Sequence, residues 1–255
     1  MDLHRFFASC PPSPRVPWAR CAQCASPLRQ DGVACTGAKQ HAVAAPTLRL
    51  YATQTSTRAN LREMHARGVR VLVGPDQLER YGRDQPFLSY ALDNGAWGCH
   101  RRGMSFDGDA FSRALDRWGS AADWIVLPDV VADGPASLDL SLRWVDIVAA
   151  YGRPALLPVQ DGVDVASVRA VLPRVGGIFV GGSTTWKEAT VRAWCVLARE
   201  RGAHIHVGRV NSARRIALCV DAGAHSADGT SLTRYASTAS RLDRAARAPR
   251  HPSLF

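Results

Sequence analysis

The chain has 255 residues, of which 46% are hydrophobic. This length and composition suit a globular protein that buries a sizeable core in one large domain or two modest ones. No stretch approaches the roughly 18 uninterrupted apolar residues of a membrane span. The opening sequence MDLHRFFASCPPSPR, with an acid at position 2 and several prolines, differs from a secretory signal. We therefore expect a cytoplasmic protein without a membrane partner.

The charge of the chain is strongly positive. Thirty-two basic residues, 30 of them Arg, stand against 22 acidic residues and give a net charge of +10. Arg pairs bidentately with phosphate and stacks on bases, so a nucleic-acid partner is one interpretation of this excess. The alternative is a solvated basic surface in a protein from a GC-rich genome.

Cysteines are concentrated near the N-terminus, where four of the seven lie within the first 35 residues. Disulfides are not expected in a cytosolic chain. Cys21, Cys24, Cys35 and His41 could supply three sulfurs and one nitrogen to a structural zinc ion. The segment is also rich in Pro and Ala, so residues 1–46 form either a small zinc-binding knob or a loose N-terminal arm.

Strand-like and helix-like segments alternate from residue 47 onward. In chain order the pattern predicts strands at 48–55, 69–74, 86–93, 123–129, 154–160, 176–182, 204–210 and 224–227. Between them it predicts helices or helical turns at 57–67, 76–81, 109–118, 136–151, 165–172, 188–201, 212–223 and from 231. Ser212 is expected to cap the helix that ends at Gly223.

Eight strands joined by helical connections pair in parallel, because each crossover returns the chain in the same direction. The sequence therefore predicts an α/β fold, a compact (β/α)₈ TIM barrel over residues 47–245, followed by a basic tail at 246–255. A doubly wound open sheet is the structural alternative. Neither a Gly-x-Gly-x-x-Gly fingerprint nor a Walker-type loop follows the first strand, which disfavours nucleotide-cofactor folds.

Polar residues stand where the predicted strands end. They are Asp93, Asp129, Gln160, Gly181 with Gly182, and Asp228. In a barrel all of these positions meet at one mouth, where active sites are built. Each residue also has a purely structural explanation: an acid can cap a turn or start a helix, an amide can satisfy a loop, and glycines can form turns.

The set suits displacement at the anomeric carbon of a sugar. One carboxylate attacks C1′ while a second one moves protons for the leaving and entering groups. The amide of Gln160 can read the edge of a base, and a glycine lets a flat ring approach the backbone. Trp97 either stacks on that ring or belongs to the core.

An ordered series of short motifs resembles the queuine tRNA-guanine transglycosylases. The motifs are DNGAW at 93–97, PD at 128–129, VQDG at 159–162, VGGS at 180–183, HVG at 206–208 and GAHSAD at 223–228. The run from about Leu48 to Arg241 resembles more closely the short deazapurine-in-DNA transglycosylases (the DpdA family) of phages and bacterial DNA-modification clusters. No single motif is specific, and their succession carries the resemblance.

The resemblance implies roles for two acids. Asp228 matches the nucleophile that attacks C1′ of the target guanosine, expels guanine and holds a covalent glycosyl-enzyme intermediate. Asp93 matches the acid/base aspartate of the family's Asp-Ser-Gly-Gly-Phe motif, here Asp-Asn-Gly-Ala-Trp. The implied reaction exchanges guanine for preQ0, a 7-cyano-7-deazaguanine, and leaves the backbone intact without any cofactor for the chemistry.

The resemblance also implies a binding site for the base. Asp129 and Gln160 match residues that bind the purine face of guanine and of the incoming 7-deazaguanine. Gly181 and Gly182 match the glycine strand end against which the base packs, and Trp97 matches an aromatic beside it.

The chain departs from the tRNA enzymes in two ways. Their Cys-x-Cys-x-x-Cys…His zinc module after the last strands has no counterpart, and an Arg-rich segment with Arg241, Arg244, Arg247 and Arg250 stands there instead. Gly-Thr-Ser follows Asp228 in place of their Cys-Val-x-Pro-Thr-Arg. DNA is therefore the expected partner. The alternatives are a tRNA-guanine transglycosylase, a barrel N-glycosidase or nucleosidase that transfers to water, and a basic DNA-binding barrel without activity; the oligomeric state stays open.

Overall fold

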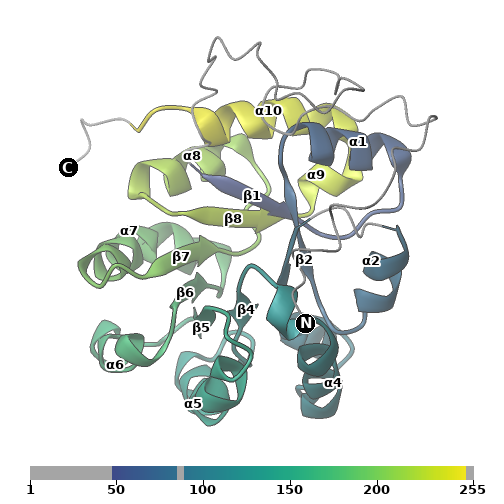
Figure 1. Ribbon diagram of the computed structural model, residues 1–255. Coiled ribbons are helices and arrows are strands. Elements are labelled where there is room, and N and C mark those ends of the chain that lie inside the picture. The colour runs from purple at the N-terminus through teal and green to yellow at the C-terminus, as the bar shows by residue number, and fades with distance from the viewer. Residues whose placement is uncertain (1–47, 85–88, 251–255) are drawn as a thin grey trace, which may run out of the picture. The chain divides into compact units, whose positions relative to one another are not determined.

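A computed structural model describes residues 48–84 and 89–250. Eight parallel strands pair in sequence order and close into a barrel, with β8 against β1 (Figure 1). They are β1 (Arg49–Ala52), β2 (Arg70–Val73), β3 (Tyr90–Leu92), β4 (Ile125–Val126), β5 (Ala155–Val159), β6 (Gly177–Val180), β7 (His204–Val207) and β8 (Ser226–Gly229). The predicted (β/α)₈ barrel is confirmed, and the open-sheet alternative is wrong.

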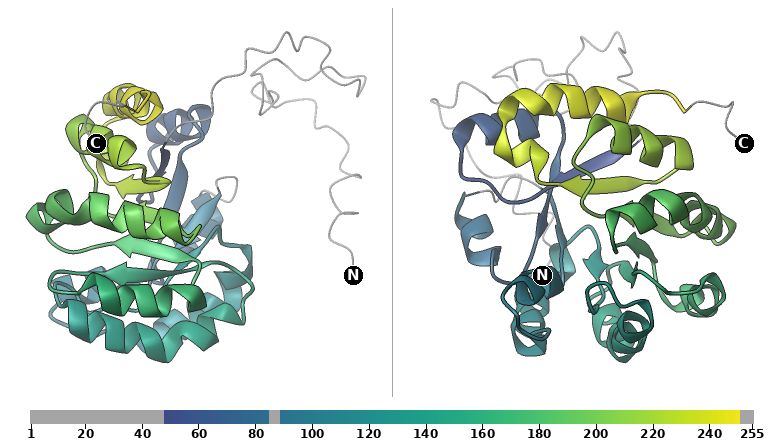
Figure 2. Two further views of the ribbon diagram at one scale, coloured as in Figure 1. Left: turned by 90° about the vertical axis from the view of Figure 1, so that its left-hand side faces the viewer. Right: turned by 180° about the vertical axis from the view of Figure 1, so that it is seen from behind.

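Helices connect the strands and lie around the outside of the barrel (Figure 2). They are α1 (Arg58–Ala66), α2 (Leu78–Asp84), α3 (Ala96–Arg101), α4 (Gly108–Trp118), α5 (Gly134–Ala149), α6 (Val165–Val171), α7 (Thr184–Glu200), α8 (Ala213–Ala222), α9 (Ser231–Arg234) and α10 (Ala236–Arg247). None of the helices in the described ranges is both long and apolar enough to cross a membrane.

Side-chain caps begin several of these helices. Asp133 accepts a hydrogen bond from the Ala136 amide (3.0 Å) at the start of α5. Ser212 caps α8 as expected, and the left-handed Gly223 (φ +89°) ends it. An acceptor at the first position and a glycine just past the last one satisfy the backbone groups that a helix leaves unpaired.

Four details differ from the sequence-based expectation. Most strands are shorter than predicted, because pairing ends while the apolar run continues. A short helix, α3, begins at Ala96 where only a turn was expected. Asp228 lies inside β8, which continues to Gly229, although the last strand was expected to end at residue 227. Helix α10 ends at Arg247, within the segment that the sequence describes as a tail.

Aromatic and apolar side chains fill the barrel interior. Tyr51, Leu72, Ala91, Trp124, Val126 and Leu156 form one buried cluster, with Phe179 packed against it. Its polar atoms are paired: the Tyr51 hydroxyl donates to Asp123 (2.9 Å) and accepts from the Trp124 indole (3.0 Å). Asp123 also forms an ion pair with Arg70 (2.5 Å). This layer forms a packed floor beneath the side chains at the barrel mouth.

Candidate active site at the barrel mouth

The predicted site residues come from the carboxyl ends of five of the eight strands. Asp93 follows β3, Asp129 follows β4, Gln160 follows β5, Gly181 and Gly182 follow β6, and Asp228 lies in β8. Because the strands are parallel and form one closed barrel, these positions share its carboxyl end.

Asp93 is a half-buried carboxyl surrounded by other acids. Burial, the charges of Asp129 and Asp228, and a smaller contribution from Asp76 together raise its pKa from 3.8 to about 7. One hydrogen bond opposes this rise, from the Asn94 amide to Oδ1 (2.9 Å). The structure thus brings three predicted acids from β3, β4 and β8 within electrostatic reach of one another.

Asp129 is held by amide groups on both oxygens. Asn94 Nδ2 donates to its Oδ1 (2.9 Å) and to the Leu127 carbonyl (2.7 Å), and Gln160 Nε2 donates to its Oδ2. Burial raises the pKa of Asp129, while these hydrogen bonds lower it. Asp133, not Asp129, caps the following helix, so the helix-start explanation of Asp129 is wrong.

Gln160 uses its amide inside the protein. Besides its bond to Asp129, its Oε1 accepts from the Gly182 amide (2.7 Å) and from Ala132 N (3.4 Å). One Nε2 hydrogen remains for a ligand. In the described structure Gln160 therefore orients Asp129 and the β6 turn, and can offer a base only a single donor.

The two residues after β6 must be glycines because neighbouring side chains lie close to their backbone. A Cβ on Gly181 would lie 2.6 Å from Gln160 Nε2, and one on Gly182 would lie 2.5 Å from Asp161 Oδ2. Gly182 also has a left-handed backbone (φ +75°). Asp161 in turn accepts from the Ser183 amide (2.7 Å) and hydroxyl (2.6 Å). Both glycines therefore form the turn and also leave room for a neighbouring side chain, the Gln160 amide at Gly181 and the Asp161 carboxylate at Gly182.

Trp97 is not a core residue. It lies on α3 with 42% of its surface exposed, and the guanidinium carbon of Arg209 is 4.4 Å from the centre of its ring. Arg209 has a left-handed backbone (φ +58°) and also donates to the Gly182 carbonyl. A stacked cation and aromatic ring therefore join the loop after β7 to α3, beside the acids.

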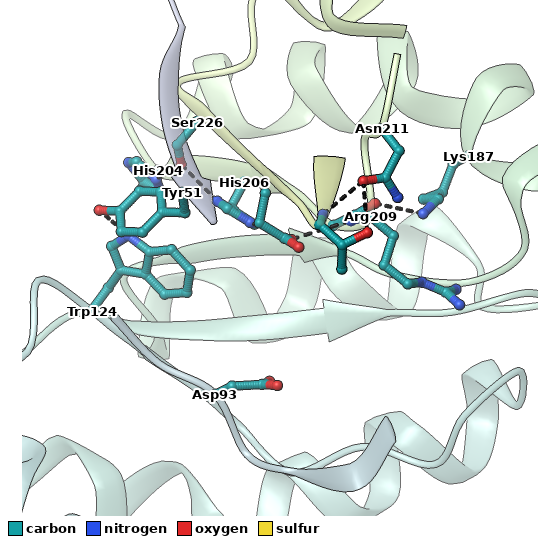
Figure 3. A network of polar contacts seen from close by, with 12 residues as sticks. Tyr51, Asp93, Trp124, Lys187, His204, His206, Arg209, Asn211 and Ser226 are labelled. Carbon is teal, nitrogen blue, oxygen red and sulfur yellow. Dashed lines mark hydrogen bonds and ion pairs between the residues drawn. The ribbon is translucent and has the colours of Figure 1, made fainter. Parts of the chain in front are cut away.

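Asp228 is buried, and its two oxygens differ. Oδ1 accepts hydrogen bonds from His206 Nε2 (3.0 Å) and from the Arg209 amide (3.2 Å). In the part of the chain that the structure describes, Oδ2 receives no hydrogen bond. Asp93 lies across the barrel interior from His206 (Figure 3). The carboxylate of Asp228 is thus fixed through one oxygen while the other is free to react.

Two further side chains hold the loops around Asp228. Asn211 Oδ1 accepts from the backbone amides of Thr230 (2.7 Å) and Ser231 (3.1 Å), which follow β8. The buried Lys187 donates to the Gly208 carbonyl (2.5 Å), and burial, together with the nearby Arg209, lowers its pKa to about 8. Both contacts fix the backbone on either side of the Asp228 carboxylate.

Sequence reasoning did not assign roles to His206, Arg209, Lys187, Asn94 or Asn211. The sequence did contain a signal for His206. His204 and His206 are two residues apart in β7, and Ser226 and Asp228 are two residues apart in the neighbouring β8. A spacing of two places such pairs on one face of a strand. Nothing local in the sequence marks Lys187, which lies in the first turn of α7 and is buried.

The described residues contain no cluster of three or more His, Cys, Asp or Glu that could hold a metal ion. Cys21, Cys24, Cys35 and His41 lie outside the described residues, so a zinc site there stays a prediction. What the mouth does contain is one carboxyl that titrates near neutral pH and a second one that is buried and hydrogen-bonded on one side.

Comparisons with known proteins do not assign a family. No family model matches the chain, and no curated protein matches it. Among solved structures, a designed cube-shaped porous protein cage built from fused symmetric oligomeric domains is similar, with 15% identity and a TM-score of 0.49 over 78% of this chain and 72% of that one.

Proposed function

We propose that the chain is a guanine transglycosylase that replaces guanine in DNA by a 7-deazaguanine base such as preQ0. The observation that carries this proposal is the unequal environment of two acids at one barrel mouth. Asp93 has a pKa raised to about 7, whereas Asp228 is held at one oxygen by two donors. A proton donor beside a fixed nucleophile is the arrangement that double displacement at C1′ requires.

In the first displacement, Asp228 Oδ2 attacks C1′ of the target nucleotide and forms a C1′–O bond. The bond from C1′ to the base nitrogen breaks, and its electron pair leaves with guanine. Asp93, protonated at neutral pH, gives its proton to the departing base. The product is a glycosyl ester on Asp228 with the sugar–phosphate backbone unbroken.

In the second displacement, the incoming 7-deazaguanine loses a proton to the Asp93 carboxylate. Its nitrogen then attacks C1′, and the ester bond breaks, which returns Asp228 to its carboxylate form and Asp93 to its acid form. Charge and protons balance over the two steps, so no cofactor is required. Asp129, fixed by Asn94 and Gln160, would accept a donor from the edge of the bound purine.

Nucleic acid as the substrate is supported by the net charge of +10 and by the half-buried Arg209 stacked on the exposed Trp97 beside the acids. Guanidinium and indole groups both stack on bases. A base in duplex DNA must leave the helical stack to reach such a site, at a cost of a few kcal/mol. The sequence departures from the tRNA enzymes favour DNA, in the cytoplasm of a bacterium or a phage-infected host.

The test is incubation of the full chain with preQ0 and, separately, single-stranded DNA, duplex DNA and tRNA, followed by mass spectrometry of the nucleosides. We expect one equivalent of guanine to be released per deazaguanine incorporated, with DNA as the substrate. Incorporation into tRNA alone would instead identify a tRNA-guanine transglycosylase. Guanine release that leaves abasic sites would identify an N-glycosidase, because water would have taken the sugar.

A matched pair of variants links the activity to the site. Asp228→Asn should abolish both exchange and the covalent nucleic-acid adduct, which can be detected as a shifted band on a denaturing gel. Asp139→Asn makes the same chemical change at an exposed position of α5 and should leave exchange unaltered. Full exchange by Asp228→Asn would exclude the assigned nucleophile.

A further inference from the structure

A buried chain of hydrogen bonds leads to Asp228 through the barrel interior. His204 Nε2 lies 2.8 Å from the Ser226 hydroxyl, which lies 2.8 Å from His206 Nδ1, and His206 Nε2 lies 3.0 Å from Asp228 Oδ1. The register of β7 against β8 pairs His206 with Ser226, so the side chains meet inside the barrel (Figure 3). The proposed reaction uses only the last member of this chain.

His206 is enclosed by aromatic rings. Its side chain is fully buried, stacks on Phe179 with ring centres 5.0 Å apart, and contacts the rings of Trp124 (4.6 Å) and Tyr51 (5.6 Å). These contacts fix the plane of the His206 ring and restrict rotation of its side chain. Burial lowers the pKa of His206 more than Asp228 raises it, and the Lys187 ammonium lowers it further. The imidazole is therefore neutral and carries a single proton.

The position of that proton follows from its neighbours. Asp228 Oδ1 accepts the Arg209 amide, and a carboxylate oxygen is an acceptor, so the proton of His206 is on Nε2. Nδ1 is then an acceptor and receives the Ser226 hydroxyl hydrogen. Because the hydroxyl has only one hydrogen, the Ser226 oxygen accepts from His204 Nε2. Burial lowers the pKa of His204 to about 3, so this ring is neutral as well. Every donor in the chain thus points toward Asp228.

We propose that His206 is a positioning residue whose Nε2–H tautomer, supported by the Ser226 hydroxyl at Nδ1, holds Oδ1 of Asp228 and leaves Oδ2 as its reacting atom. That Oδ2 attacks a sugar rests on the proposed function, but the hydrogen-bond arrangement does not. A carboxylate acting as a nucleophile needs one fixed oxygen and one free oxygen, and the chain through Ser226 fixes Oδ1 without adding a charge inside the barrel.

The decisive measurement is nitrogen NMR of the full chain labelled at its histidine side chains. The chain has eight histidines, and the signals absent from His206→Gln assign this residue. We expect a neutral ring with an unprotonated Nδ1 and a protonated Nε2 from about pH 6 to about pH 8. A proton on Nδ1, or a doubly protonated ring in this range, would overturn the proposal.

Activity of three variants separates positioning from packing. His206→Gln keeps a donor near Asp228, whereas His206→Met fills similar volume without one. We expect kcat for exchange to fall about 100-fold in His206→Met and about 10-fold or less in His206→Gln, with KM little changed. Ser226→Ala should lose about 10-fold in kcat and convert part of the His206 signal to the other tautomer. Equal losses in the Gln and Met variants would refute the donor role.

The two proposals fail in different ways. If the native chain exchanges no base on any nucleic acid but His206 shows the Nε2–H tautomer, the function is wrong and the hydrogen-bond arrangement stands. If exchange occurs and His206→Met is as active as the native chain, the function stands and the positioning role is wrong.

Discussion

The charge of Asp228 raises the pKa of Asp93, although the two carboxylates stand on β8 and β3, three strand positions apart around the barrel. The strands carry them to a shared mouth, where Asp129 adds a third carboxyl group whose charge also raises the pKa of Asp93. Asp228 has two donors on Oδ1, whereas Asp93 has one. Burial and the charges of these two neighbours together raise the pKa of Asp93 to about 7.

This relationship can be measured without any substrate. Asp228→Asn removes one of the charges that raise the Asp93 pKa, so this pKa should fall below about 7 while staying above 3.8, because burial is the larger cause. Carbon NMR of labelled aspartate carboxyls gives the titration. An unchanged pKa in Asp228→Asn would show that the two carboxylates do not interact.

The rate of base release should depend on the protonated form of Asp93. Its raised pKa of about 7 means that the acid form predominates below that pH and is lost above it. We expect the single-turnover rate of guanine release to decrease about tenfold per pH unit on the alkaline side of about pH 7. Rapid-quench measurements across this range test it. In Asp93→Asn the residual rate should show no such decrease.

The raised pKa of Asp93, which favours proton donation to the base, should lower the stability of the folded protein at alkaline pH. The folded state raises the Asp93 pKa from 3.8 to about 7, so the unfolded chain releases this proton more readily. The native protein therefore loses stability as pH rises through this window, by on the order of 2–4 kcal/mol. Asp93→Asn avoids this loss, so it should be more stable than the native chain at pH 8, with the difference shrinking toward pH 4. Urea unfolding at several pH values measures it, with Asp139→Asn as the control.

The fold was predictable because its signal is repeated. Eight apolar runs separated by helical patterns determine a parallel barrel even though nearly all predicted strand boundaries differ from the structure by one to four residues. Acids at strand ends then had to meet at one mouth, whatever the local errors. The α3 helix was missed because it begins inside a turn sequence: Gly95 stands at its N-cap position, and Asn94 Oδ1 accepts from Ala96 N (2.8 Å).

The internal partners of the site were not predictable from single positions. Gln160 was expected to read a base, yet most of its amide is bonded to Asp129 and Gly182. Which side chain an amide selects depends on the distance between β4, β5 and β6, which no local pattern specifies. The role of His206 similarly requires the register of β7 against β8, since only that pairing brings Ser226 to its ring.

Gly181 offers a test of the Asp129–Gln160 contact. Gly181→Ala would place a methyl group 2.6 Å from Gln160 Nε2, so the amide must move away from Asp129. Overpacking of this kind costs about 1–3 kcal/mol, and we expect KM for the incoming base to rise about 10-fold or more. Gly98→Ala, whose nearest neighbour would be the flexible Arg102 at 3.5 Å, is the matched control. Equal KM values for the two variants would mean that the Asp129–Gln160 contact does not shape the base site.

The loop after β8 is held by one residue, Asn211. Asn211 Oδ1 receives the backbone amides of Thr230 and Ser231, and its own carbonyl accepts the Ser231 hydroxyl (2.9 Å). Asn211→Ala leaves those two amides without their acceptor, which should cost about 1–3 kcal/mol in unfolding free energy. Because these residues directly follow β8, kcat for exchange should fall as well.

Asn211→Asp distinguishes the acceptor from the side chain's other properties. Its carboxylate oxygen can accept the same two amides, and its negative charge lies at the start of α9, so stability close to that of the native chain is expected. Urea unfolding and exchange kinetics of both variants provide the comparison. If Asn211→Asp were as unstable as Asn211→Ala, the amide nitrogen of Asn211, and not its oxygen, would be the group that holds the loop. If neither variant lost stability, the position of Asp228 would depend on β8 and its neighbours alone.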